Sequence, residues 1–428
     1  MKISMSYQET LDYLYGLEHF GISLGLENIH ALMAAFDNPQ EQLAIVHVAG
    51  SNGKGSTISF LKDMLAAAGL RVGVYTSPHL RHFSERIVVA GKPITEAEIV
   101  ELTRELRPVA EEIPRIVTFF DFTTAMALLY FSRLQPDVVI LETGLGGTLD
   151  ATNVVSKPRL TMITNIALEH EEYLGHTLLS VAREKAGILK PLTPLVSGVR
   201  NRRVREFIEQ KNQSLGEKCY FSGRDFRIRR KPDRSFSYKG LRRQLKDLRV
   251  QMLGEYQQDN ASLALCALEV LAELGVANPD DSQIRRGLAG SFWPGRLEKV
   301  SSKPDFYIDG AHNPHGVRAL MPVLRQLSAG RRLILLIGAM KDKQVSVMVS
   351  YLAPLAAEVI VTQAKLDRSC STEQLYLEAE KYCQRVFRTE TIAEAISLGR
   401  KRAKVDDLIF FTGSLYCVGE ALEEIKNS

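Results

Sequence analysis

Short continuous apolar runs alternate with helix-like stretches over the first part of the chain. The runs at residues 44–48, 71–76, 137–141 and 160–164 are rich in Val, Ile and Leu. Runs of this length between helical stretches predict strands that are buried on both faces. Such strands, joined through helices, form a mostly parallel sheet. We therefore predict an α/β domain with its ligand chemistry at the carboxyl ends of the strands.

Residues 224–249 have a different pattern, in which Arg and Lys alternate with apolar residues. Pro232 and the pair Lys239-Gly240 supply turns, so we predict an antiparallel hairpin with one face in water. A solvated basic face is the favoured interpretation, and a surface that receives an acidic substrate tail is the alternative. Residues 254–274 then return to helical spacing.

The pattern breaks again at residues 291–298, where Pro294 and Gly295 indicate a linker. Apolar runs then resume, at 306–308, 333–337, 359–361 and 408–411. A chain of 428 residues is long enough for two or three domains. We predict a larger α/β domain over residues 1–294 and a smaller α/β domain over residues 295–428.

Composition narrows the class of protein. The chain is 45% hydrophobic and 24% charged, as in soluble globular proteins, and no apolar run reaches the length of a membrane span. The first 21 residues lack the apolar core of a signal peptide, and the five cysteines show no C-x-x-C spacing. The net charge of +4 permits an anionic substrate without requiring nucleic acid. We expect a monomeric cytoplasmic protein that binds neither nucleic acid nor membrane.

The segment between the first strand and its helix carries the clearest chemical signal. It spells A-G-S-N-G-K-G-S-T over residues 49–57, where glycines allow backbone N–H groups to surround phosphate oxygens. The helix N-terminus and Lys54 add positive charge. The spacing departs from G-x-x-x-x-G-K-[ST], which argues against a GTPase or a motor. We predict a phosphate-binding loop formed by Gly50, Ser51, Asn52, Gly53, Lys54, Gly55 and Ser56. An ordinary Gly-rich turn is the alternative.

An acid ends the buried strand at residues 137–141. Glu142 is followed by T-G-L-G-G, whose glycines let the backbone approach a ligand. A carboxylate beside a phosphate loop can hold Mg²⁺, although an acid at a strand end is often only a turn residue. The glycines favour the magnesium interpretation.

Motifs along most of the chain resemble the folylpolyglutamate synthase and dihydrofolate synthase family of the Mur ligase superfamily. The loop at 50–56 resembles the family's G-[ST]-N-G-K-G-S, and residues 183–188 match R-E-K-A-G-I. Residues 142–153 resemble E-T-G-L-G-G-R-L-D-A-T-N, with Thr148 in place of Arg, and residues 309–314 are an intact D-G-A-H-N-P. The chain most resembles the bifunctional bacterial members. The resemblance implies that residues 1–294 form a Mur-ligase-like P-loop domain and that residues 295–428 form a smaller, Rossmann-like α/β domain.

This resemblance implies a site for two Mg²⁺ ions. Ser77, in an S-P-H-L loop, and His170 would be metal ligands together with Glu142. Lys185 would be carbamylated, which turns an ammonium into a carboxylate-like ligand for the second ion. From helical spacing alone, Lys185 would instead be a solvated surface lysine. Glu169 replaces the family's Asp beside the histidine.

The resemblance also implies contacts to ATP and to the second substrate. Asn260 would bond adenine, Arg296 would reach the phosphates and Asp309 would lie at the nucleotide, while Tyr256 replaces a family His. His312 would lie near the reacting groups, so the implied catalytic residues are Lys54, Lys185 and His312. The implied substrate residues are Thr118, Phe120, Asp121, Asp150, Ala151 and Ser414.

The implied reaction is the ATP-dependent formation of an amide. A substrate carboxylate attacks the γ-phosphate of ATP, and the amine of L-glutamate then displaces phosphate from the acyl phosphate. The acceptors would be dihydropteroate and reduced folate. Another Mur-type acid–amino-acid ligase is one alternative. A nucleotide-binding relative that has lost its activity is another, supported by Thr148 and Glu169. The intact set of Lys54, Glu142, His170, Lys185 and residues 309–314 argues against it.

Overall fold

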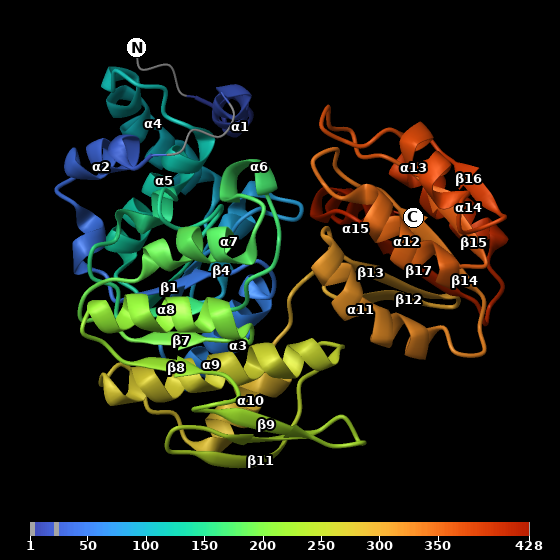
Figure 1. Cartoon of the computed structure of the whole chain (residues 1–428). Coiled ribbons are helices and arrows are strands. Elements are labelled where there is room, and N and C mark those ends of the chain that lie inside the picture. The colour runs from blue at the N-terminus through green and yellow to red at the C-terminus, as the bar shows by residue number, and fades with distance from the viewer. Residues whose placement is uncertain (1–4, 21–24, 428) are drawn as a thin grey trace. The chain divides into compact units, whose positions relative to one another are not determined.

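A computed structural model describes residues 5–20 and 25–427 of the chain, which divide into two compact units (Figure 1). The first unit comprises Met1–Gln251 and Gln258–Ser291, and the second comprises Met252–Gln257 and Phe292–Ser428. Each unit has its own sheet and its own core. The predicted mixed α/β fold is confirmed.

The first unit contains an eight-stranded sheet with the order β4-β3-β2-β5-β1-β6-β7-β8. Its strands are β1 (Ile45–Ala49), β2 (Val72–Tyr75), β3 (Ile87–Val89), β4 (Lys92–Pro93), β5 (Val138–Glu142), β6 (Leu160–Ile163), β7 (Leu195–Ser197) and β8 (Cys219–Phe221). The four predicted strands are β1, β2, β5 and β6, and they are parallel neighbours at the centre of the sheet. Only the pairs β2/β3 and β3/β4 of this sheet are antiparallel.

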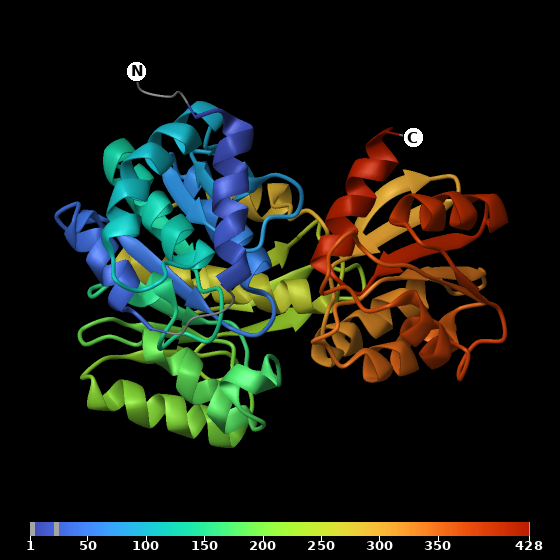
Figure 2. The same ribbon diagram turned by 90° about the horizontal axis from the view of Figure 1, so that it is seen from above.

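Helices lie on both faces of this sheet (Figure 2). Its helices are α1 (Tyr7–Gly16), α2 (Glu27–Ala34), α3 (Lys54–Ala67), α4 (Glu96–Glu112), α5 (Phe119–Leu134), α6 (Glu171–Leu174), α7 (Leu178–Lys185), α8 (Arg202–Ser214), α9 (Glu255–Glu273) and α10 (Asp281–Gly290). Ile45 of β1 joins a cluster with α1, α2, α4 and α5. These helices therefore cover one face of the sheet. Successive strand residues point to opposite faces, and the opposite face is covered by α3, which contacts β1, β2 and β5.

A separate three-stranded antiparallel sheet consists of β9 (Arg227–Arg230), β10 (Phe236–Lys239) and β11 (Gln244–Leu248). Phe236 and Tyr238 are buried whereas Arg227 and Arg229 are exposed, which confirms the predicted hairpin with one wet face. The Tyr238 hydroxyl donates to the buried Glu269 carboxylate of α9 at 2.6 Å, so α9 anchors the sheet.

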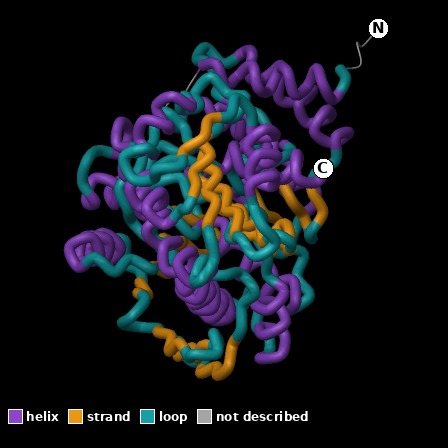
Figure 3. Tube along the Cα trace, turned by 90° about the vertical axis from the view of Figure 1, so that its right-hand side faces the viewer, coloured by secondary structure: helices purple, strands orange, loops and turns teal. Residues whose placement is uncertain are grey.

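The second unit is built on a six-stranded sheet with the order β12-β13-β17-β14-β15-β16, parallel except at β12. Figure 3 draws the strands in orange and the helices in purple. The strands are β12 (Glu298–Ser302), β13 (Asp305–Asp309), β14 (Leu333–Ile337), β15 (Glu358–Val361), β16 (Val386–Arg388) and β17 (Leu408–Thr412). The helices are α11 (Pro314–Leu327), α12 (Val345–Leu352), α13 (Thr372–Ala379), α14 (Ile392–Arg402) and α15 (Leu415–Asn427). The core cluster joins α11, α12 and α13 to one face of the sheet.

Two further features of the described residues concern helix length and the cysteines. No helix over residues 5–20 and 25–427 is long and apolar enough to cross a membrane. All five cysteines are free thiols, and four of them are buried.

A histidine lies in the middle of the first sheet. His47 of β1 has no exposed surface, and its Nε2 lies 2.8 Å from the Thr152 hydroxyl. Burial, with a smaller effect of the Lys190 charge, lowers the pKa of His47 to about 3. The imidazole is therefore neutral in the folded protein at physiological pH.

We expect His47 to make the protein acid-sensitive. The unfolded chain takes up a proton at this histidine near pH 6.5, whereas the folded chain does so only near its lowered pKa. The stability contribution is complete above pH 6.5 and falls by about 1.4 kcal/mol per unit as the pH drops below that value. Between pH 7 and 5, His47→Gln should lose about 2 kcal/mol less unfolding free energy than the wild type in urea titrations. His30→Gln, at an exposed position of α2, is the control, and equal losses in all three proteins would contradict the prediction.

Candidate active site

Four strands of the first sheet end at one edge, which we call the carboxyl edge. In the register, Val48 of β1 is opposite both Glu142 of β5 and Met162 of β6, and β2 is the other neighbour of β5. The phosphate loop follows β1, Ser77 follows β2 and Glu142 ends β5. Parallel pairing thus brings together three predicted site segments that are far apart in the sequence.

The loop at residues 50–53 requires glycine at two positions. Gly53 has a φ of +82°, in the left-handed region, and a Cβ there would lie 2.6 Å from the Asn260 amide oxygen. A Cβ on Gly50 would lie 1.9 Å from the Thr164 hydroxyl. The predicted adenine ligand Asn260 therefore packs against the loop itself, and larger residues at either glycine would displace the loop.

Two residues that the sequence analysis did not select hold the loop in place. Asn165 accepts the Ser51 N–H on its carbonyl oxygen at 3.0 Å and the Asn52 N–H on its side chain at 2.9 Å. The Thr164 hydroxyl donates to the Asn52 carbonyl at 2.7 Å. Both residues directly follow β6, which pairs with β1, the strand that leads into the loop. That position is the sequence signal that could have identified them.

Backbone donors remain at the start of α3. The Thr57 N–H donates to the Gly53 carbonyl in the first backbone bond of the helix. The N–H groups of Lys54, Gly55 and Ser56 precede that bond, so they lie at the helix N-terminus, where anions bind. These three amides, rather than those of Ser51 and Asn52, are the donors available to a phosphate group.

Lys54 and Glu142 form a pair beside the loop. The Lys54 ammonium donates to the Gly50 carbonyl at 2.9 Å and lies 3.8 Å from Glu142 Oε1. Glu142 is only 6% exposed, and its Oε2 accepts the Ser77 N–H at 3.2 Å. The structure thus brings Lys54, Glu142 and Ser77 together, as the sequence predicted for a phosphate and metal site.

The other predicted metal ligands come from the segments after β6. His170 is the half-buried N-cap of α6, with a φ of +46°. Over the part of the chain that the structure describes, no three His, Cys, Asp or Glu residues are grouped as a metal site. The predicted ligand set contains only two residues of these types, Glu142 and His170.

Lys185 is buried, so the interpretation from helical spacing alone, a solvated lysine, is wrong. The side chain is 3% exposed, and its ammonium lies 2.7 Å from Glu169 Oε1. Val181 and Ala182, four and three residues earlier on α7, are also buried. Lys185 therefore continues the inward-facing stripe of the helix rather than its wet face.

The Glu169–Lys185 pair is electrostatically coupled to the phosphate loop. Burial opposes ionisation of Glu169, but the charges of Lys185 and then Lys54 lower its pKa to about 2. Burial also lowers the pKa of Lys185, against the opposing effect of Glu169. A permanent carboxylate thus lies beside an amine that gives up its proton more readily than a surface lysine.

Two predicted substrate residues of the first unit, Asp150 and Phe120, contact the loop that follows Glu142. Asp150 is buried and accepts the N–H groups of Gly144 and Leu145 at 2.9 and 2.8 Å, which fixes that loop. Burial raises the pKa of Asp150. A Cβ on Gly144 would lie 2.6 Å from the Phe120 ring. The other predicted substrate residues of this unit stabilise local structure. Thr118 and Asp121 form the capping box of α5, and Ala151 begins a buried 3₁₀ turn.

A second group of predicted residues lies at the carboxyl ends of β13 and β17 in the second unit. Asp309 is paired in register with Thr412, and its carboxylate accepts the N–H groups of Leu297 and Ala311 at 2.9 and 2.8 Å. Burial raises the pKa of Asp309, and the charge of Arg296 opposes that shift. In the same region, His312 Nδ1 lies 2.9 Å from the Gly310 carbonyl and Ser414 is buried.

Comparison with known proteins assigns the chain to a family. Residues 48–268 match the Mur ligase middle domain, and residues 295–415 match the Mur ligase, glutamate ligase domain. The chain is 34% identical to the dihydrofolate synthase/folylpolyglutamate synthase of Bacillus subtilis, over 98% of this chain and 99% of that protein. It belongs to the dihydrofolate synthase/folylpolyglutamate synthase family of Mur ligases.

Other members of this family agree in sequence and in structure. The Escherichia coli dihydrofolate synthase/folylpolyglutamate synthase is 32% identical, over 97% of this chain and 94% of that protein. The structure of E. coli FolC with DHPP and ADP has a TM-score of 0.90 at 30% identity, with 98% of each chain covered. A Yersinia pestis family member with AMPPNP and Mn ion has a TM-score of 0.88 at 31% identity, again with 98% of each chain covered. The predicted family and the predicted ATP-dependent ligase class are confirmed.

Proposed function

We propose that this ligase joins L-glutamate both to dihydropteroate, giving dihydrofolate, and to reduced folates, giving folylpolyglutamates. The observation that carries the proposal is the phosphate loop with Lys54 and Glu142 at the carboxyl edge of the first sheet. Relatives whose structures hold ADP, DHPP or ATP analogues support ATP and a pterin acid as its substrates.

Lys54 and the loop amides have a defined role in the proposed first step. A substrate carboxylate attacks the γ-phosphate of ATP, and negative charge develops on the transferring phosphoryl group. Lys54 and the N–H groups at the start of α3 would offset that charge. Because Asn165 and Thr164 already hold the loop, these donors need little reorganisation when the nucleotide binds.

The donor atoms beside the loop fit a magnesium ion. Glu142 offers a buried carboxylate, and Ser77, whose backbone N–H donates to that carboxylate, carries a hydroxyl. Mg²⁺ takes one or two protein oxygens in addition to phosphates and water. We propose that Glu142, Ser77 and His170 hold it, with a modified Lys185 at a second ion. When bound, the metal neutralises phosphate charge.

We also propose that Lys185 takes up CO₂. The unprotonated amine forms the new N–C bond and releases a proton, and burial favours that unprotonated form by lowering the pKa of Lys185. The resulting carbamate would lie next to Glu169, 2.7 Å from the present ammonium position. Two adjacent anions require cations, which Lys54 and a metal ion would supply.

The proposed division of labour follows the sequence domains. We propose that residues 1–294 bind ATP and the pterin substrate and that residues 295–428 contribute Arg296, Asp309, His312 and Ser414. Asn260 would contact adenine beside the loop. The free cysteines support our further proposal that the enzyme works in the cytoplasm, and we propose that it acts as a monomer.

Arg296→Ala should weaken the use of ATP without unfolding the protein. A guanidinium suited to phosphate oxygens would be lost, so we expect at least about a tenfold rise in the KM for ATP. Arg325→Ala, an exposed arginine of α11, is the matched control in the same unit. Unchanged ATP kinetics for Arg296→Ala would remove this residue from the site.

The decisive experiment is to measure ADP release by the purified protein with L-glutamate and one acceptor at a time. Dihydropteroate and tetrahydrofolate should each support ADP release, with the amide products identified by mass spectrometry. Release with only one acceptor would limit the enzyme to that reaction. Release with neither would overturn the proposal and favour a different acid or a protein without ligase activity.

A further inference from the structure

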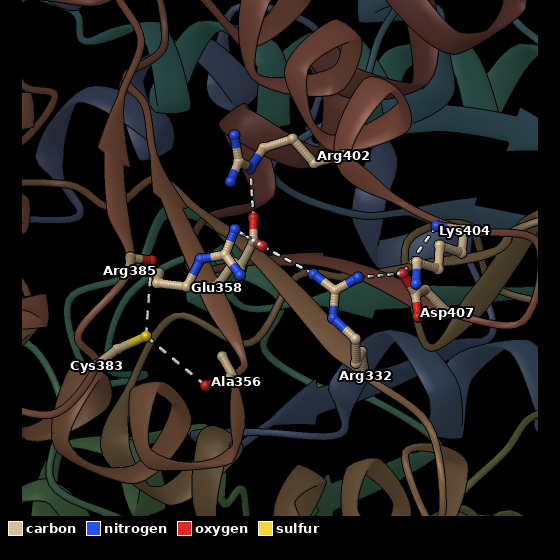
Figure 4. Close-up of polar contacts among 8 residues, drawn as sticks. All are labelled: Arg332, Ala356, Glu358, Cys383, Arg385, Arg402, Lys404 and Asp407. Carbon is tan, nitrogen blue, oxygen red and sulfur yellow. Dashed lines mark hydrogen bonds and ion pairs between the residues drawn. The ribbon is translucent and has the colours of Figure 1, made fainter.

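A buried carboxylate surrounded by basic side chains lies at the amino ends of the strands of the second unit. Glu358, the first residue of β15, is 1% exposed. Its Oε1 accepts a hydrogen bond from Nη2 of Arg332 at 2.8 Å, and its Oε2 accepts one from Nε of Arg402 (Figure 4). Nη2 of Arg385 forms an ion pair with Oε1 at 2.7 Å. This edge of the sheet is opposite to the one that carries Asp309.

The same groups line a hollow of about 620 Å³. Its lining consists of Arg332, Glu358, Arg385, Leu398, Lys401, Arg402 and Lys404. Asp407 lies behind Arg332 and accepts its Nη1 at 3.1 Å. Five basic side chains around these two carboxylates leave a charge of +3 in one small region.

An internal ion-pair network alone does not account for this arrangement. One carboxylate fully engages a single bidentate guanidinium, whereas Glu358 forms ion pairs with three guanidinium groups. Within residues 5–20 and 25–427, no acceptor contacts the Arg402 Nη groups, and no carboxylate pairs with the ammonium groups of Lys401 or Lys404. These basic groups carry like charges close together, and an anion among them would lower their mutual repulsion.

We propose that this hollow binds a compact polyphosphate anion such as pyrophosphate. Glu358 holds the three guanidinium groups in place, so their remaining donors are already arranged for phosphate oxygens. Leu398 is the apolar member of the lining, and the Arg402 guanidinium covers the Phe387 ring at 3.8 Å, so little apolar surface is offered to a base or a pterin ring. High charge density matches this set of donors better than the spaced carboxylates of a peptide tail.

The test is calorimetric titration of the full-length protein with pyrophosphate and with tripolyphosphate. The phosphate loop is a competing site, so each titration is run with saturating ADP and without Mg²⁺, which would complex the polyphosphate, and again in the Lys54→Ala variant. We expect one binding event that persists under both conditions. In the double variant K401S/K404S, which removes two exposed ammonium groups of the hollow, affinity should fall at least about tenfold.

A charge-matched double variant serves as the control. R400S/K381S removes the same charge from the same unit. Arg400 directly precedes Lys401 on α14, and Lys381 is an exposed lysine paired with Glu378; neither residue lines the hollow. Its affinity should stay within about twofold of the wild type. Absence of binding, equal weakening in both double variants, or equally tight binding of citrate would each overturn the proposal.

Discussion

Replacing Lys54 with alanine will lower the turnover of the ligase at least about a hundredfold while the protein stays folded. The lysine lies at the start of α3 beside Glu142, where its charge would offset the charge that develops during phosphoryl transfer. Loss of such a contact costs on the order of 3 kcal/mol of transition-state stabilisation. The loop keeps its shape because Asn165 and Thr164, not Lys54, hold residues 51 and 52.

Turnover is measured as ADP release, and folding is measured by circular dichroism and thermal unfolding. Lys62→Ala, on the same helix but paired with Asp63, is the matched control and should retain near-normal turnover. A Lys54→Ala variant with near-normal turnover would mean that the loop does not work as proposed.

Replacing Lys185 with alanine should also abolish most activity, but with a cost in stability. The change leaves Glu169 buried without its partner, and breaking a buried ion pair in this way costs about 3–5 kcal/mol. The double variant K185A/E169Q removes the stranded charge and should recover most of that stability without recovering turnover. Unfolding free energy and ADP release measured on both variants separate the two effects.

Carbamylation of Lys185 has a readout that does not depend on activity. With ¹³C-labelled bicarbonate, the wild type should show a carbamate carbon resonance that is absent from Lys185→Ala and retained in Lys218→Ala, an exposed control. Acetate should partly restore turnover to Lys185→Ala by occupying the vacated position. If the wild type shows no carbamate resonance and no dependence on bicarbonate, Lys185 is an ammonium held by Glu169. The ligase proposal would survive, because Glu142, phosphate oxygens and water are sufficient ligands for Mg²⁺.

Local sequence was enough to predict the framework of the first sheet. The strands β1, β2, β5 and β6 were recognisable because a strand buried on both faces must be apolar along its whole length. The phosphate loop was recognisable because glycines at positions 50 and 53 are needed to avoid Thr164 and Asn260. The position of Glu142 beside that loop followed from the rule that parallel strands end at one edge.

Contacts between distant segments were decided only by the tertiary structure. Lys185 is buried because α7 turns its last residue inward, and its partner Glu169 precedes it by sixteen positions on another segment. The clamp of Asn165 on the loop likewise joins residues more than a hundred positions apart. The arginines around Glu358 come from three separate segments, and nothing in the local pattern of any of them indicates the others. Periodicity reports which face of an element is buried, whereas the partner on that face depends on how the strands are ordered in the sheet.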